Sequence, residues 1–136
     1  MSRSRDSAAP VQAVVEGGCH CGAVQFAVQG KPRAALVCNC SICTMKGYLH
    51  WIVPRASFRL VAPASEEELP VYRFGTGVAQ HRFCGACGVQ AFYVPRSDPD
   101  KVDVNLRTVR GLDLGALPIE TFDGQNWEAA YELYRR

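Results

Sequence analysis

The sequence predicts a mainly β domain, and three features support this fold class. Short runs of apolar residues alternate with polar ones at period two, the spacing of a strand with one buried face. Gly, Pro, Ser and Asp separate these runs, as they do in turns. A segment near the C-terminus has the pattern of a short helix.

The individual elements follow from these runs. The expected strands cover residues 11–17, 23–30, 50–54, 57–61, 71–74, 89–95 and 102–106. Residues 41–46 predict one helical turn that begins at Ser41. Asn126 is the expected cap of the C-terminal helix, whose apolar positions are Trp127, Ala130, Tyr131 and Tyr134. The acidic run 66–68 predicts an exposed hairpin tip rather than a catalytic cluster.

The length of 136 residues predicts a single domain. We expect residues 1–12 to form a disordered tail and residues 13–136 to form the domain. A formal charge of +2, with scattered basic residues, gives no indication of nucleic-acid binding. Apolar runs fall short of the ~20 residues needed to cross a bilayer, and the N-terminus lacks the apolar region of a secretion signal. We therefore expect a cytoplasmic protein without a membrane partner, and the sequence leaves its oligomeric state open.

All seven cysteines fall in three clusters, which are a CxC at Cys19 and Cys21, a CxCxxC at Cys38, Cys40 and Cys43, and a CxxC at Cys84 and Cys87. Disulfides are disfavoured because the cytosol keeps thiols reduced and an odd number cannot be fully paired within one chain. The spacing instead predicts zinc, since neighbouring thiolates can converge on one ion at ~2.3 Å. Buried apolar cysteines are the alternative, but they would have no reason to cluster.

Glycines flank two of these clusters. Gly17, Gly18 and Gly22 bracket the CxC, and Gly85 and Gly88 bracket the CxxC. We expect them to supply the positive-φ conformations of metal-binding knuckles. Seven thiolates divide into a closed site of four and an open site of three, but spacing alone leaves the combination of clusters undetermined.

Three segments resemble the glutathione-dependent formaldehyde-activating enzyme family, which also contains centromere protein V: GGCHCGAVQF, CNCSIC and AQHRFCGACGVQAFYVPRSDP. The resemblance covers about residues 15–132, and HWIVP and FDGQNWE are closer to the centromere protein V branch. It implies a β-tent of small antiparallel sheets with zinc knuckles and a short C-terminal helix.

The resemblance also implies two zinc ions and an activity. The cysteines that match the family's structural zinc ligands are Cys19, Cys21, Cys84 and Cys87. Those that match its catalytic zinc, which has an open position for a thiol, are Cys38, Cys40 and Cys43. The family's named reaction adds glutathione to formaldehyde and is classed with the carbon–sulfur lyases. The implied partners are therefore a small thiol such as glutathione and a small aldehyde.

Histidines near the clusters are the candidates for proton transfer. His50, on an expected strand, is the catalytic candidate. We expect His81 to pack or to donate a hydrogen bond to a sulfur, because it closely precedes the CxxC. His20 lies inside the CxC and is expected to point away from the ion, because adjacent side chains of an extended segment face opposite ways.

Cations beside the motifs are candidates for binding the carboxylates of glutathione, and these are Lys46, Arg82 and Arg96. Aromatic residues that would line a cleft, or else pack in the core, are Tyr48, Trp51, Phe92 and Tyr93. Two other functions remain open. One is a non-catalytic zinc-binding interaction module, and the other is a thiol sensor that loses its three-cysteine zinc on oxidation.

Overall fold

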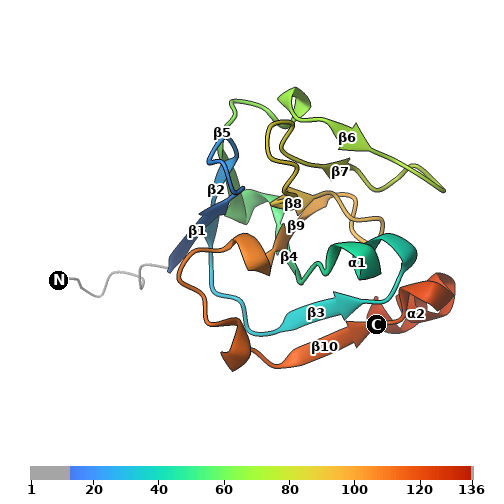
Figure 1. Ribbon diagram of the computed structural model, residues 1–136. Helices are drawn as coiled ribbons and strands as arrows, with labels where there is room; N and C mark the ends of the chain where they lie inside the picture. Colours follow the sequence, from blue (N-terminus) through green and yellow to red (C-terminus); the bar gives the residue numbers. More distant parts are fainter. Residues whose placement is uncertain (1–12, 136) are drawn as a thin grey trace.

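The computed structural model describes residues 13–135, so the tail expected at residues 1–12 lies outside the described part of the chain. The described residues form a mainly β fold with a short helix at the C-terminal end (Figure 1). Their strands make three small sheets with five, three and two members. The predicted fold class is therefore confirmed.

The three-stranded sheet contains, in spatial order, β1 (Val14–Gly18), β2 (Gln25–Gln29) and β5 (Phe58–Ala62). Both strand pairs are antiparallel. The central strand, β2, buries Phe26 and Val28, which alternate with polar or small residues in the sequence. The expected strands at 11–17, 23–30 and 57–61 correspond to this sheet, and the first of them begins at Val14 in the structure.

The five-stranded sheet contains, in spatial order, β10 (Ile119–Phe122), β3 (Ala35–Cys38), β4 (His50–Pro54), β9 (Lys101–Asn105) and β8 (Phe92–Tyr93). Its pairs are antiparallel with one exception, because β10 runs parallel to β3. The sequence analysis missed β3 and β10. The edge strand β10 exposes three of its four residues, so it has no buried alternation to detect.

The two-stranded sheet pairs β6 (Val71–Tyr72) with β7 (His81–Arg82). The long loop between these strands extends to the right in Figure 1, which is also the side of the molecule where α1 and α2 lie. The expected strand at 71–74 is thus shorter than predicted.

Helix α1 (Ser41–Lys46) forms the predicted single turn and a little more. Its cap is Cys40 rather than Ser41, because the Cys40 sulfur accepts a hydrogen bond from the Cys43 N–H at 3.5 Å. The helix ends at Gly47, whose φ of 62° is the left-handed conformation that glycine adopts at little cost. The residue that caps this helix is therefore also a candidate metal ligand.

Helix α2 (Trp127–Tyr134) is the predicted C-terminal helix. Asn126 occupies the cap position, but its side chain does not cap the helix. It donates instead from Nδ2 to Asp123 Oδ2 at 2.9 Å. The side chain thereby stabilises the turn that leads into the helix.

The acidic run forms the 3-10 turn η2 (Glu66–Glu68) rather than a simple hairpin tip. Ser65 and Glu68 make a capping box around this turn. Glu66 pairs with Arg55 at 2.6 Å. The run therefore has a local structural role.

The core lies between the sheets and includes two of the cysteines. Its buried members include Cys19, Val24, Phe26, Val28, Cys84, Phe92, Val102, Val104 and Leu106. Cys19 and Cys84 thus connect the CxC and CxxC clusters directly to the hydrophobic core.

Candidate metal centres and the adjoining cavity

The structure brings the seven cysteines together as one group of four and one group of three, the division that the resemblance implies. The group of four contains Cys19, Cys21, Cys84 and Cys87, whose sulfurs lie within 4.8 Å of one another. Cys21 Sγ is 3.7 Å from Cys19 Sγ and 3.6 Å from Cys84 Sγ. A tetrahedral ion with sulfur ligands at ~2.3 Å would separate them by about 3.8 Å. The spacing therefore fits a zinc ion.

Backbone N–H groups point at the sulfurs of this group. The N–H of Val24 donates to Cys19 Sγ at 3.2 Å. Those of Ala86 and Cys87 donate to Cys84 Sγ at 3.4 Å each. The N–H groups of Cys87 and Ala86 lower the pKa of the Cys84 thiol. Such donors stabilise thiolates, which is the form that binds metal.

Glycine has two different functions around these knuckles. Gly22 and Gly88 have φ values of 85° and 79°, as expected for tight turns. Gly17, Gly18 and Gly85 do not have positive φ, which corrects the prediction for these three positions. At Gly17 and Gly18 an added Cβ would collide with neighbouring backbone, so close packing is what requires glycine there.

The group of three lies where β3 meets α1. Its members are Cys38 at the end of β3, Cys40 at the helix cap and Cys43 within α1. Among residues 13–135, no fourth Cys, His, Asp or Glu side chain joins this group. Hydrogen bonds from Cys38 and then Cys43 lower the pKa of the Cys40 thiol, whereas hydrogen bonds with Cys38 and then Cys40 raise the pKa of the Cys43 thiol. The group is thus suited to hold a cation and leave one position open.

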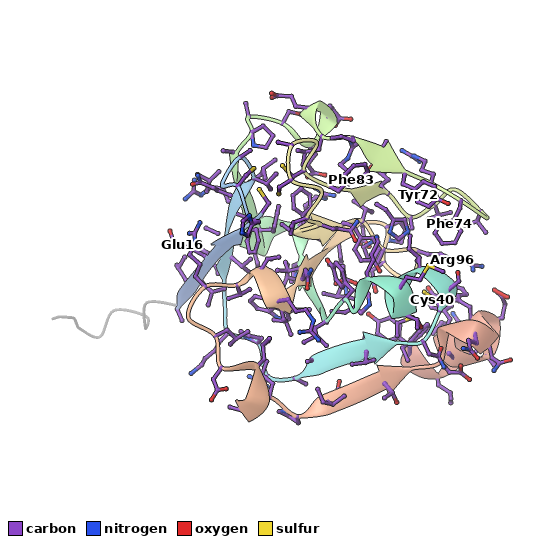
Figure 2. The ribbon with its side chains drawn as sticks, viewed as in Figure 1. Glu16, Cys40, Tyr72, Phe74, Phe83 and Arg96 are labelled. Carbon is purple, nitrogen blue, oxygen red and sulfur yellow. The ribbon has the colours of Figure 1, made fainter. Side chains whose placement is uncertain are left out.

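A cavity of about 450 Å³ opens beside the three cysteines. One side is formed by α1 and the C-terminal segment, and another by residues 74–76 of the loop between β6 and β7. In Figure 2, Cys40, Phe74 and Arg96 lie on the same side of the molecule, and all three line this cavity. Its volume is in the range of small-molecule sites. The three-cysteine group therefore faces space that a ligand can occupy.

His50 and Asp103 form a buried pair on the wall of this cavity. Their side chains are 4% and 1% exposed, and His50 Nδ1 lies 2.6 Å from Asp103 Oδ2. Burial raises the pKa of Asp103, while the neighbouring His50 opposes this shift. His50 Nε2 and Asp103 Oδ1 have no hydrogen-bond partner among the described residues. Both atoms are buried, so the protein leaves the hydrogen-bonding capacity of Nε2 unused.

His81 is enclosed by aromatic rings. Its ring stacks on Tyr93 at 4.8 Å and on Phe74 at 5.5 Å between centroids. Burial, followed by the charge of Lys46, lowers the pKa of His81 to about 4. The structure thus places a neutral, packed imidazole beside the cavity.

Lys46 lines a second cavity of about 410 Å³ that adjoins α1. Its Nζ donates to Gln90 Oε1 at 2.5 Å and lies 3.4 Å from His81 Nδ1. Burial lowers the pKa of Lys46, while the negative charges of the Cys43 and Cys40 thiolates oppose this shift. Ile42 and His81 line both cavities.

The two arginine candidates have different surroundings. Arg96 lines the main cavity, where its guanidinium lies 3.6 Å from the centroid of the Trp127 ring and 2.9 Å from a carboxylate oxygen of Glu128. Arg82 is 7% exposed and donates to the carbonyl oxygens of Glu66 and Leu69. Arg82 therefore holds the η2 turn and lines neither cavity.

The remaining candidates have varied positions. Tyr93 lines the main cavity and Tyr48 lines the second one. Phe92 lies in the core and Trp51 packs against it. His20 is exposed.

Asp103 and Gly124 are site residues that the sequence analysis missed. Both line the main cavity, yet neither belongs to a cysteine motif. Asp103 lies in a strand, β9, where a polar residue would usually face solvent. Its pairing with His50, which only the structure shows, identifies it as a site residue.

A membrane-spanning helix needs a longer apolar stretch than any helix in residues 13–135 provides.

Comparison with known proteins agrees with this arrangement. A crystal structure of a Rhodobacter sphaeroides protein is 34% identical, with a TM-score of 0.67, and the match covers 77% of this chain and 99% of that one. The family model described as glutathione-dependent formaldehyde-activating enzyme matches residues 14–127. The three cysteine segments that resemble this family all lie within the matched residues. The chain therefore belongs to the glutathione-dependent formaldehyde-activating enzyme family.

Proposed function

We propose that the chain is a zinc-dependent carbon–sulfur lyase that adds a small thiol such as glutathione to a small aldehyde such as formaldehyde. The observation that carries this proposal is a three-cysteine group that shares a cavity with the His50–Asp103 pair. Membership in the family supports a thiol and an aldehyde as the reactants.

We assign one zinc ion to each cysteine group. Sulfur spacing and N–H donors support this assignment for the group of four. Clustered thiolates favour zinc over magnesium or calcium, which prefer oxygen ligands. An ion held by Cys38, Cys40 and Cys43 would supply a coordination position that favours the thiolate form of an incoming thiol.

His50 is the residue that we assign to proton transfer. The addition forms a bond between the thiol sulfur and the aldehyde carbon, breaks the π bond of the carbonyl, and moves one proton from sulfur to oxygen. With Nδ1–H donated to Asp103, the neutral His50 ring has a free lone pair at Nε2. Nε2 can accept the thiol proton and return it to the new hydroxyl oxygen.

The carboxylates of glutathione require cationic partners. Arg96 is the better placed candidate, because it lines the cavity that the three cysteines face. Lys46 lies on the neighbouring cavity and is a candidate for a ligand that extends past Ile42. Arg82 is not part of the proposed site, because its guanidinium bonds to backbone carbonyls.

Exchange NMR with ¹³C-labelled formaldehyde and glutathione tests the proposal, because it separates catalysed from spontaneous addition. We expect the wild-type protein to accelerate the exchange between formaldehyde and S-hydroxymethylglutathione. Cys40→Ser should return the exchange to the uncatalysed rate. Met45→Ala is the matched control, since Met45 lies in the same helix with its side chain 89% exposed.

Two outcomes would favour other functions. A fully metallated wild-type protein that leaves the exchange at its spontaneous rate would contradict the lyase proposal and favour an interaction module. Loss of that protein's zinc on mild peroxide treatment, again without catalysis, would favour a thiol sensor.

A further inference from the structure

The C-terminal segment crosses over the three-cysteine group. β10 lies beside β3 with Phe122 paired to Cys38. The chain then enters the 3-10 turn η5 (Gly124–Asn126), and Gly124 lies against both Cys38 and Cys40. Residues more than eighty positions apart in the sequence are therefore in contact at this site.

Asn39 fastens this segment to the cysteine loop. Its side-chain Nδ2 donates to Asp123 Oδ1 at 2.9 Å. Its Oδ1 accepts the Gln125 N–H at 3.0 Å. Asn39 lies between Cys38 and Cys40, so the two hydrogen bonds on either side of Gly124 set the distance between the segment and the sulfurs.

The space at Gly124 is too small for any side chain. A Cβ atom there would lie 2.5 Å from Cys38 Sγ, 2.8 Å from Cys40 Cβ and 3.2 Å from Cys40 N. Favourable contacts between such atoms are about 3.5–4.0 Å. Gly124 does not have a positive φ, so its backbone conformation is open to other residues. The requirement for glycine is therefore steric and comes from the cysteines.

We propose that Gly124 is a positioning residue of the three-cysteine metal site. Its bare backbone packs against Cys38 and Cys40 and holds their sulfurs in the converged arrangement. Any side chain at this position would push the sulfurs apart or displace the segment. This inference rests on the metal-binding part of the proposed function and is independent of the thiol and aldehyde chemistry.

The same contact links the metal site to the cavity wall. α2 begins directly after η5 and contributes Trp127 and Tyr134 to the cavity. Trp127 in turn carries the guanidinium of Arg96 on its ring. A displaced segment would therefore move this wall as well as the sulfurs.

Chelator titration of the reduced, Co²⁺-loaded full chain tests this inference, because thiolate-to-cobalt absorption reports sulfur coordination directly. We expect two equivalents to bind to the wild-type protein. Gly124→Ala should retain one tight equivalent and bind the second at least ten-fold more weakly. Competition with Zn²⁺ should show the same loss.

Gly115→Ala is the matched control, because Gly115 is an exposed glycine in the 3-10 turn η4 (Leu114–Ala116). A Cβ there would meet only Asp113 Oδ1, at 3.4 Å. This variant should bind two equivalents as the wild-type protein does.

The four-cysteine group serves as an internal control of folding. Equal affinity for the second equivalent in the wild-type protein and Gly124→Ala would overturn the inference alone. Loss of both equivalents in Gly124→Ala would also overturn it, because the predicted effect is local. Uptake of one equivalent by the wild-type protein would overturn the two-zinc assignment of the proposed function as well.

Discussion

The two cysteine groups use the same ligand type, but their surroundings differ. The group of four joins parts of the chain 63 residues apart, and two of its members lie in the hydrophobic core. The group of three comes from one short segment and faces a cavity. A metal that closes a long loop in the core contributes directly to folding, whereas one held by a short loop at a cavity is free to serve a ligand.

Serine substitution in each group gives the largest expected difference. Cys84→Ser should abolish the cooperative unfolding transition, since structural zinc contributes ~10–16 kcal/mol, as much as the whole stability of a small domain. Cys40→Ser should lower the melting temperature by only a few degrees, about 1 kcal/mol. Thermal denaturation followed by circular dichroism would measure both. Equal losses would contradict the proposed division between a structural and a functional site.

Asp103 offers a way to affect the open site alone. Asp103→Asn should slow the exchange reaction by about 10²-fold, because the amide no longer selects the His50 tautomer with a free Nε2. Metal content should remain at two ions. ¹⁵N NMR of the imidazole would report the changed tautomer, which a merely structural effect would leave unaltered.

The matched control for this substitution is Asp100→Asn, since Asp100 is exposed and does not line the cavity. An Asp103→Asn protein that retains the wild-type rate would exclude His50 as the residue that transfers the proton. Loss of one metal ion in Asp103→Asn would instead show that Asp103 stabilises the metal site.

His81 belongs to both regions, because it lies on the strand that leads to Cys84 and lines the cavity of the other group. Burial lowers its pKa from 6.5 to about 4. The unfolded chain therefore takes up this proton first as the pH falls, so the folded state loses stability between pH 6.5 and about 4. We expect this effect to reach about 3 kcal/mol at pH 4.

His81→Phe should remove that part of the pH dependence, because phenylalanine keeps the stacking with Phe74 and Tyr93. Urea unfolding between pH 4 and 7 would give the free energy of unfolding of both proteins. The difference between the two values at each pH isolates the contribution of His81, because pH effects common to both proteins cancel. Parallel curves for the two proteins would show that His81 is protonated equally in the folded and unfolded states.

The smallest expected effect concerns Arg96 at the cavity wall. Arg96→Ala should raise the KM for glutathione about five-fold and leave kcat unchanged. The effect is small because Arg96 is partly exposed, so its ion pair with a glutathione carboxylate would be weakened by solvent. The KM for an uncharged thiol such as 2-mercaptoethanol should not change. A similar rise for both thiols would indicate lost packing on Trp127 rather than lost charge.

The amino-acid sequence alone determined the local features of this protein. Period-two patterns located the strands at 50–54 and 102–106, and cysteine spacing identified the three clusters of candidate metal ligands. These features depend on neighbours a few residues away, so a linear pattern contains them. The edge strand β10 was missed because its side chains are mostly exposed.

Only the tertiary structure decided which distant residues complete the sites. It placed Asp103 beside His50, and Gly124 against Cys38 and Cys40. It also showed that Arg82 holds backbone carbonyls, although the residue lies beside a metal motif in the sequence. Such contacts depend on strand pairing and on the path of the C-terminal segment. Both are set by burial and hydrogen bonding across the whole fold, which no short motif records.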